Sequence, residues 1–293
     1  EHGFLARWLE LFRQCAGEDL WRATPYFAAA SRFRAAATSP DGRHGVTFGD
    51  PQYVVVGDAW YHLLAACRTG DAEARAMGGM WLNTSPVGTD HRHAPPRRRV
   101  YELLWDEPQP PGCAPAEGCR QAADGGQVFV RRGDLLVTTR AGAPLGRMRR
   151  AAGEPGGYGH SDPCNGAVLI WCGRDFAGSG PGPSYRRDTA QHNVVTIDGR
   201  GQVGDGCVWY PDFVAEGSIP PEPQVRRRGG TVVVQMDLTR AYLPVLGVRR
   251  YTRSLTIARD GTLRGVDVIE LKRAASIEWN WHTWMQVRAR GWV

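Results

Sequence analysis

The hydrophobic pattern of the chain changes across a Pro- and Gly-rich stretch at residues 106–125, and this change restricts the fold more than any other feature. Before the stretch, apolar residues recur at the three- and four-residue spacing of amphipathic helices. The segments with this spacing are 4–16, 20–38, 53–67, 71–81 and 98–105. Helices that follow one another through short loops, with no strand between them, indicate an all-α region.

Beyond residue 125 the pattern alternates or runs apolar over short segments, as it does in β-strands. Residues 127–132 and 134–140 form a predicted hairpin, and Asp260-Gly261 is typical of a hairpin turn. Further strands are predicted at 166–172, 193–198, 206–210, 213–217, 231–237, 249–258, 261–269 and 275–282. Many strands at regular spacing indicate an antiparallel sandwich. We therefore predict an α+β chain with a helical region at 1–110, a linker at 111–125 and an antiparallel β-sandwich at 126–293.

The positive charge of the chain comes almost entirely from arginine. The formal net charge is +6, and Lys272 is the single lysine among 36 basic residues. Guanidinium groups bind carboxylates and sulfates in a bidentate geometry, so this composition favours an anionic partner, although GC-rich codon usage produces the same bias. The 11 tryptophans offer stacking platforms for sugars, but most large rings in proteins fill the core.

Two classes of partner are not expected. No segment is apolar over the length that a membrane span needs. The GxG sequence at 199–201 is a turn and not a nucleotide-binding loop, because no helix is predicted to follow it. We therefore expect neither a membrane span nor a nucleic-acid partner. The chain starts at Glu1 rather than at methionine, and the predicted sandwich ends early, so we expect a fragment or a processed form.

Two histidines stand directly before strand-like runs. His160 lies in a glycine-rich segment at 156–165 (GGYGHSDPCN), and His192 is the second-last residue of a polar segment at 186–193 (RRDTAQHN). A strand that begins beside a histidine holds a titratable ring at the rigid edge of a sheet. Such a position suits a metal ligand or an acid/base group, so these two segments are the candidate functional site.

The two segments and their surroundings resemble the heparinase II/III-like polysaccharide lyases, whose relatives include oligoalginate lyases and uronyl epimerases. Further motifs match the family in the same order along the chain. The matching segments are 40–50, 159–165 (GHSDPCN), 173–176, 187–202, 237–242 (DLTRAY) and 277–283 (IEWNWHT). The resemblance implies the C-terminal part of an (α/α) toroid followed by an antiparallel β-sandwich, in agreement with the pattern of helices and strands.

The resemblance implies β-elimination at a uronic acid residue of an anionic polysaccharide or oligosaccharide, in a secreted or periplasmic bacterial protein. The reaction removes the C5 proton of the uronate, so it needs a base, a neutralised carboxylate and an acid for the leaving oxygen. In the family, a Tyr and a His are base and acid, and Arg and aromatic side chains line the cleft. Two alternatives use the same scaffold: a catalytically inactive carbohydrate-binding or cell-envelope protein, and a uronyl epimerase.

Carried over residue by residue, the resemblance gives candidate catalytic residues in three places. His160 matches the second histidine of the central motif, and Tyr158 stands where many members have the first. His2 takes the place of a family tyrosine at a helix start. The rest of the toroid would lie upstream of residue 1, so we expect half of a catalytic site. The predicted substrate-binding residues are Tyr185, Arg186, Arg187 and Asn165.

Several family members carry a structural zinc ion bound by two histidines and an aspartate. The corresponding residues here are His160, His192 and Asp162, so the resemblance implies a structural zinc ion. The usual aspartate precedes the second histidine strand, where this chain has Ala-Gly-Ser-Gly at 177–180. Asp162 or Asp175 would have to replace it.

Overall fold

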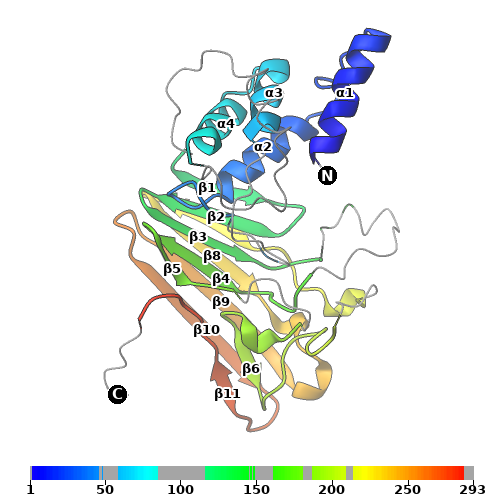
Figure 1. Cartoon of the computed structure of the whole chain (residues 1–293). Coiled ribbons are helices and arrows are strands. Elements are labelled where there is room, and N and C mark those ends of the chain that lie inside the picture. Colours follow the sequence, from blue (N-terminus) through cyan, green and yellow to red (C-terminus); the bar gives the residue numbers. More distant parts are fainter. Residues whose placement is uncertain are drawn as a thin grey trace. The chain divides into compact units, whose positions relative to one another are not determined.

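The computed structural model describes residues 2–45, 48, 59–84, 116–144, 146, 148, 161–180, 187–208 and 214–286. The chain divides into two compact units (Figure 1). A helical unit contains residues 1–45 and 53–116, and a β unit contains residues 46–52 and 117–293. Among the described helices, none is long and apolar enough to cross a membrane.

The helical unit contains α1 (His2–Ala16), α2 (Tyr26–Ala36), α3 (Ala59–Thr69) and α4 (Ala72–Thr84). The predicted helices at 4–16 and 71–81 are confirmed, whereas α2 begins later than predicted because Pro25 stands directly before it. The predicted helix at 98–105 lies outside the described residues. Buried aromatic and leucine side chains form the core of the unit: Trp21, Phe27, Trp60, Tyr61 and Leu64.

The β unit is built from antiparallel sheets. A five-stranded sheet has the order β1-β2-β3-β4-β5, a four-stranded sheet has the order β10-β9-β8-β7, and β11 pairs with β6. The strands are β1 (Gly118–Ala122), β2 (Gln127–Arg132), β3 (Leu135–Arg140), β4 (Val168–Cys172), β5 (Asp175–Gly178), β6 (Val195–Ile197), β7 (Gln224–Arg228), β8 (Thr231–Asp237), β9 (Val248–Ile257), β10 (Leu263–Leu271) and β11 (Ile277–Trp279). Short 3-10 turns occur at η2 (Thr189–Gln191), η3 (Glu216–Ser218), η4 (Thr239–Ala241) and η5 (Pro244–Leu246).

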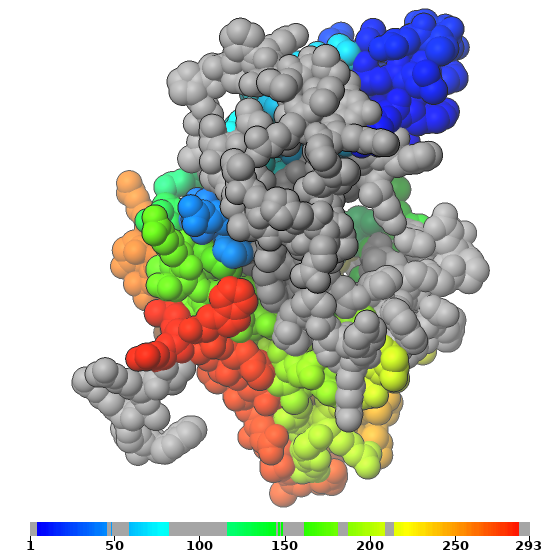
Figure 2. Space-filling model, viewed as in Figure 1, coloured from blue at the N-terminus to red at the C-terminus, as the bar shows by residue number. Residues whose placement is uncertain are grey.

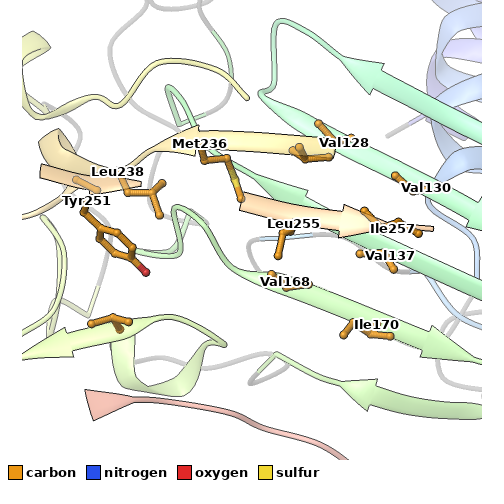
Figure 3. Close-up of a cluster of buried hydrophobic side chains, with 14 of the residues drawn as sticks. Val128, Val130, Val137, Val168, Ile170, Met236, Leu238, Tyr251, Leu255 and Ile257 are labelled. Carbon is orange, nitrogen blue, oxygen red and sulfur yellow. The ribbon is translucent and has the colours of Figure 1, made fainter. Parts of the chain in front are cut away.

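The five-stranded and four-stranded sheets share one apolar core (Figure 3). Val130 and Val137 from the first sheet belong to the same cluster as Val234 and Leu255 from the second. Every second residue of β8 and β9 is buried, so each of these strands has one face on the core. The helix-then-strand order and the antiparallel sheets therefore agree with the sequence prediction.

The strands that the sequence predicted well are those with a clear alternation. The β2–β3 hairpin, β8 and the β9–β10 hairpin around Asp260-Gly261 are all present. The prediction of a strand at 213–217 is wrong over the residues that the structure describes. Residues 216–218 form the 3-10 turn η3 instead. The sequence missed β1, β5 and β7, and β1 lies inside the predicted linker. These three strands lie at the edges of their sheets. Few of their residues are buried, so their sequences lack the apolar pattern by which a strand is predicted.

The C-terminal segment after β11 runs along the edge of the five-stranded sheet. The amide of Ser179 donates to the carbonyl of His282 at 2.8 Å, and the amide of Trp284 donates to the carbonyl of Phe176 at 3.1 Å. In Figure 2 this segment, in red, lies exposed on the surface of the β unit beside green residues. The segment therefore joins β5 to the β6–β11 pair, next to the second candidate histidine.

Candidate functional site

The structure describes part of the candidate site. Tyr158, His160, Tyr185 and Arg186 lie outside the described residues, and so does the side chain of His2 at the start of α1. The remaining candidates are described, and all of them are buried: Asp162, Asn165, Arg187 and His192. Their positions show which parts of the two segments meet in space.

Asp162, Arg187 and His192 come together from the two candidate segments. Asp162 lies before β4, whereas Arg187 and His192 flank η2 on the way to β6. Nη1 of Arg187 donates to Oδ1 of Asp162 at 3.0 Å, with both side chains almost fully buried. Nε2 of His192 lies 3.8 Å from Oδ2 of Asp162. Two segments about thirty residues apart in sequence thus share one buried polar cluster, which we call the Asp162 cluster.

His192 is a neutral imidazole at neutral pH. Burial, together with the nearby side chains of His282, Arg140 and Arg187, lowers the pKa of His192 to about 3, and burial is the largest of these causes. Its contact with Asp162 is therefore not an ion pair, although the two groups lie within 4 Å. A neutral imidazole is the form of histidine that binds a metal ion, whereas a pKa this low makes His192 a weak proton acceptor.

Asn165 fixes the first segment to a loop that follows β6. The side chain of Gln202 pairs with the backbone of Asn165: its Oε1 accepts from the Asn165 amide at 2.8 Å, and its Nε2 donates to the Asn165 carbonyl at 2.7 Å. Oδ1 of Asn165 accepts from the amide of Gly142 at 3.0 Å. Asn165 was predicted to bind substrate, and in the structure its side-chain oxygen accepts a hydrogen bond inside the protein.

Arg253 connects both segments to the four-stranded sheet, and the sequence analysis missed it. Its Nη1 donates to the carbonyls of Gly166 at 2.7 Å and Asn193 at 2.9 Å. Its Nε and Nη2 donate to the two carboxylate oxygens of Asp267 at 2.7 and 2.8 Å. Burial alone would lower the pKa of Arg253, but the bonds to Asp267 raise it. The available signal was an arginine at an inward position of β9, between Tyr251 and Leu255.

A glycine is required where the loop with Gln202 passes the second segment. A Cβ at Gly201 would collide with the Thr189 side chain and lie 2.6 Å from Cγ of Asp205. Thr189 Oγ1 accepts from the amide of Gln202 at 2.9 Å, so the collision would also disturb the pairing with Asn165.

We expect Gly201→Ala to lower the free energy of unfolding by about 1–3 kcal/mol, because the methyl group overfills a packed site. Gly217→Ala is the matched control, since nothing lies within 4 Å of its added methyl group. Urea unfolding followed by circular dichroism measures both. Equal midpoints for the two variants would contradict the tight packing at Gly201.

The described residues meet the requirements of a zinc site in part. Asp162 and His192 face each other at 3.8 Å, slightly wider than the roughly 3.3 Å between two donors on one tetrahedral zinc ion. No group of three or more His, Cys, Asp or Glu capable of holding a metal occurs within the described ranges. The third predicted ligand, His160, lies outside those ranges. Asp175, the alternative donor, is exposed at the start of β5.

Gly178 lies in the Ala-Gly-Ser-Gly stretch at 177–180, where the resemblance led us to expect a metal-binding aspartate. A Cβ on Gly178 would lie 3.2 Å from both Asn193 Nδ2 and Cζ2 of Trp281. Asn193 is itself fixed, because its Nδ2 donates to the carbonyls of Val168 and Ser179. An aspartate side chain would therefore need Trp281 to move. In this chain the position of Gly178 is packed against Asn193 and the C-terminal segment.

Comparisons with known proteins place these features in a family. Residues 114–291, which are more than half of the chain, match the family model described as "Heparinase II/III-like, C-terminal". A search of curated proteins found no match.

Solved structures with a similar fold are heparinases. A structure titled "Heparinase III-BT4657 gene product" has a TM-score of 0.50 and 14% sequence identity, over 88% of this chain and 34% of that chain. A heparan sulfate lyase HepC from Pedobacter heparinus has a TM-score of 0.49 and 14% identity, over 84% of this chain and 33% of that chain. The present chain thus spans about a third of the length of these proteins.

Proposed function

Because this chain belongs to the heparinase II/III-like family, we propose that it is part of a polysaccharide lyase that cleaves a uronate-containing anionic polysaccharide by β-elimination. The observation that carries the proposal is the meeting of the two family motifs in the Asp162 cluster, within the matched region. In this proposal α1–α4 are the last helices of an (α/α) toroid, and the protein acts in the periplasm or outside the cell.

We assign the proton transfers of this reaction to His160 and Tyr158. The C5 proton of a uronate is weakly acidic, so the base must act while the carboxylate is neutralised and the leaving oxygen is protonated. A tyrosine and a histidine on the segment before Asp162 supply a base and an acid. Proton transfer by positioned side chains contributes roughly 10²–10⁴-fold to the rate.

In our proposal the Asp162 cluster positions this segment. Arg187 is buried and bonded to Asp162, so we assign it a positioning role instead of the predicted contact with substrate. Tyr185 and Arg186, on the same segment, keep the proposed substrate contacts, because Arg binds carboxylate and sulfate bidentately. His2 stays a proposed catalytic residue from the resemblance.

The alternative role for His160 is that of a zinc ligand together with Asp162 and His192, in which case Tyr158 transfers the proton. The neutral state of His192 and its position 3.8 Å from Asp162 support it. Bound there, the ion would supply a structural cross-link between the two segments. Zinc content measured by mass spectrometry of metals, before and after dialysis against a chelator, tests this assignment.

A second candidate is a catalytically inactive carbohydrate-binding protein on the same scaffold. Gly178 packed beneath Trp281 favours it, because the family's metal-binding aspartate has no equivalent there. Tyr158 in place of a family histidine favours it as well. A uronyl epimerase is the third candidate, because it begins with the same removal of the C5 proton.

The expected result for a lyase is a rise in ultraviolet absorbance from unsaturated uronate on incubation with heparan sulfate, chondroitin sulfate or alginate. The chain and a longer protein that contains it are both assayed, because the relatives are about three times as long. Binding without any absorbance on all three polymers would replace the lyase with the inactive carbohydrate-binding protein. Exchange of the C5 proton with deuterium, without absorbance, would identify the epimerase.

A further inference from the structure

The four-stranded sheet has a second face, which points away from the core. On β9 every second residue from Tyr251 to Ile257 is buried, and the alternating residues Thr252, Ser254 and Thr256 are half-buried. Side chains alternate between the two faces of a strand. The threonines and serine of β9 therefore mark the outward face of this sheet, opposite the core that Figure 3 shows.

Two arginines from opposite edges of the sheet share a row on this outward face. Arg226 on β7 pairs with Val233, and Val233 pairs with Thr256 on β9. Thr256 in turn pairs with Arg264 on β10. Directly opposed residues of antiparallel strands lie on the same face. Arg226 and Arg264 are thus three strand spacings apart, about 14 Å at about 4.8 Å per spacing.

Two more arginines lie at the same end of the sheet. Arg228 follows Arg226 by two residues on β7, so it lies on the same face. Arg259, in the turn between β9 and β10, passes over the β7–β8 turn. Its Cδ lies 3.2 Å from the place of a Cβ on Gly230. We call these four exposed residues the arginine face: Arg226, Arg228, Arg259 and Arg264.

No carboxylate in the part of the chain that the structure describes pairs with the arginine face. None of its four residues belongs to an ion pair formed by described side chains. Asp260, next to Arg259, accepts a hydrogen bond from the amide of Thr262 at 2.9 Å. On the same face, Glu270 pairs with Arg250 near the other end of β10. Arg226 and Arg228 are neighbours on one face of β7, so their like charges repel each other, and a bound anion relieves the repulsion.

The chemistry of this face selects one class of anion. Guanidinium groups bind carboxylates and sulfates bidentately, and the hydroxyls of Thr231, Ser254 and Thr256 between them suit the hydroxyls of a sugar. The outward residues of the four strands include no aromatic ring on which a nucleic-acid base would stack. We propose that the arginine face binds a chain of anionic polysaccharide, as an accessory surface distinct from the Asp162 cluster. The choice of polymer rests on the proposed function.

The test is the salt concentration at which the chain elutes from immobilised heparin, together with its Kd for long heparan sulfate chains. The variant is Arg226→Glu with Arg228→Glu and Arg264→Glu. Its control carries the same charge change at exposed arginines elsewhere in the β unit: Arg174→Glu, Arg240→Glu and Arg249→Glu. We expect the variant to bind at least about tenfold more weakly than the control, because each reversed charge replaces an attraction with a repulsion. Equal affinities would overturn the proposal.

Two further probes distinguish a polysaccharide from a lipid surface and from a nucleic acid. Vesicles containing phosphatidylserine and single-stranded polyuridylate are tested at the same salt concentration. Binding to either that exceeds binding to heparan sulfate, and is lost in the variant, would overturn the assignment to polysaccharide. Equal urea midpoints for variant and control exclude misfolding; if the variant unfolds early, single Arg264→Ala and Arg240→Ala replace the two triple variants.

Failure of this inference and failure of the proposed function give different results. If neither the chain nor the longer protein produces unsaturated uronate, but the variant loses heparan sulfate binding, the lyase proposal fails and the arginine face stands. If turnover is observed and the variant binds like its control, the arginine face fails and the lyase proposal stands. With both correct, the variant keeps its turnover on short oligosaccharides and loses affinity for long chains.

Discussion

Arg253→Ala is expected to lower the free energy of unfolding by about 3–5 kcal/mol, the effect of breaking a buried ion pair by removing one partner. The substitution leaves Asp267 without its two bonds, and it leaves the carbonyls of Gly166 and Asn193 without a donor. Buried polar groups that lose their partners add to the loss. Urea unfolding measures the change, and hydrogen exchange shows whether β4 and β6 lose protection first.

A neighbouring residue supplies the control for Arg253. Arg250 lies on the same strand and pairs with Glu270 at 3.3 Å, with both side chains more than half exposed. Exposed ion pairs contribute about 0–1 kcal/mol, so Arg250→Ala should change stability little. Arg253→Met keeps the bulk of the side chain and removes its bonds. If Arg253→Met is as stable as the unmodified chain, the bonds to Asp267 and the two carbonyls do not stabilise the fold.

Arg253 also shows why the sequence revealed the sheets better than their connections. The alternation along β8 and β9 predicts a buried face, because burial of every second residue leaves a period of two in the sequence. The partners of Arg253 include two backbone carbonyls, which any residue type provides. An inward arginine signals that a buried partner exists, but the pattern does not identify it.

The edge strands escaped prediction for a related reason. β7 has the sequence Gln-Val-Arg-Arg-Arg and no buried residue, so its hydrophobic pattern is that of a loop. Its pairing with β8 forms through backbone hydrogen bonds, which are independent of residue type. Two of these three arginines, Arg226 and Arg228, belong to the arginine face. The features that made β7 hard to predict are those that suit a binding surface.

The candidate site was predictable to the level of its motifs. The resemblance identified Asp162 and His192, and the structure brings them within 3.8 Å of each other. It also assigned Arg187 and Asn165 to the substrate, whereas both make buried bonds within the protein. Gln202, which pairs with the backbone of Asn165, lies at the end of the matched segment 187–202 and was given no role of its own. A motif shows which residues occur together. It does not distinguish residues that contact substrate from residues that fix the segment in place through hydrogen bonds within the protein.

His160→Ala is expected to lower turnover of uronate polymers by about 10²–10⁴-fold, the usual contribution of a general acid or base. The measurement is the rate of unsaturated uronate formation, with the urea midpoint measured on the same protein. His44→Ala is the control, because His44 lies in a loop of the helical unit. Equal turnover in the two variants would remove His160 from the reaction.

His160 has two proposed roles, and zinc content separates them. If His160 is a zinc ligand, His160→Ala loses zinc together with turnover, and His192→Ala does the same. If His160 transfers a proton, His160→Ala loses turnover and keeps its zinc. Tyr158→Phe completes the comparison, because it removes one hydroxyl from a residue that is not a proposed ligand. A loss of turnover at constant zinc in Tyr158→Phe, together with zinc loss in His160→Ala, assigns the proton transfer to Tyr158 and a structural role to His160.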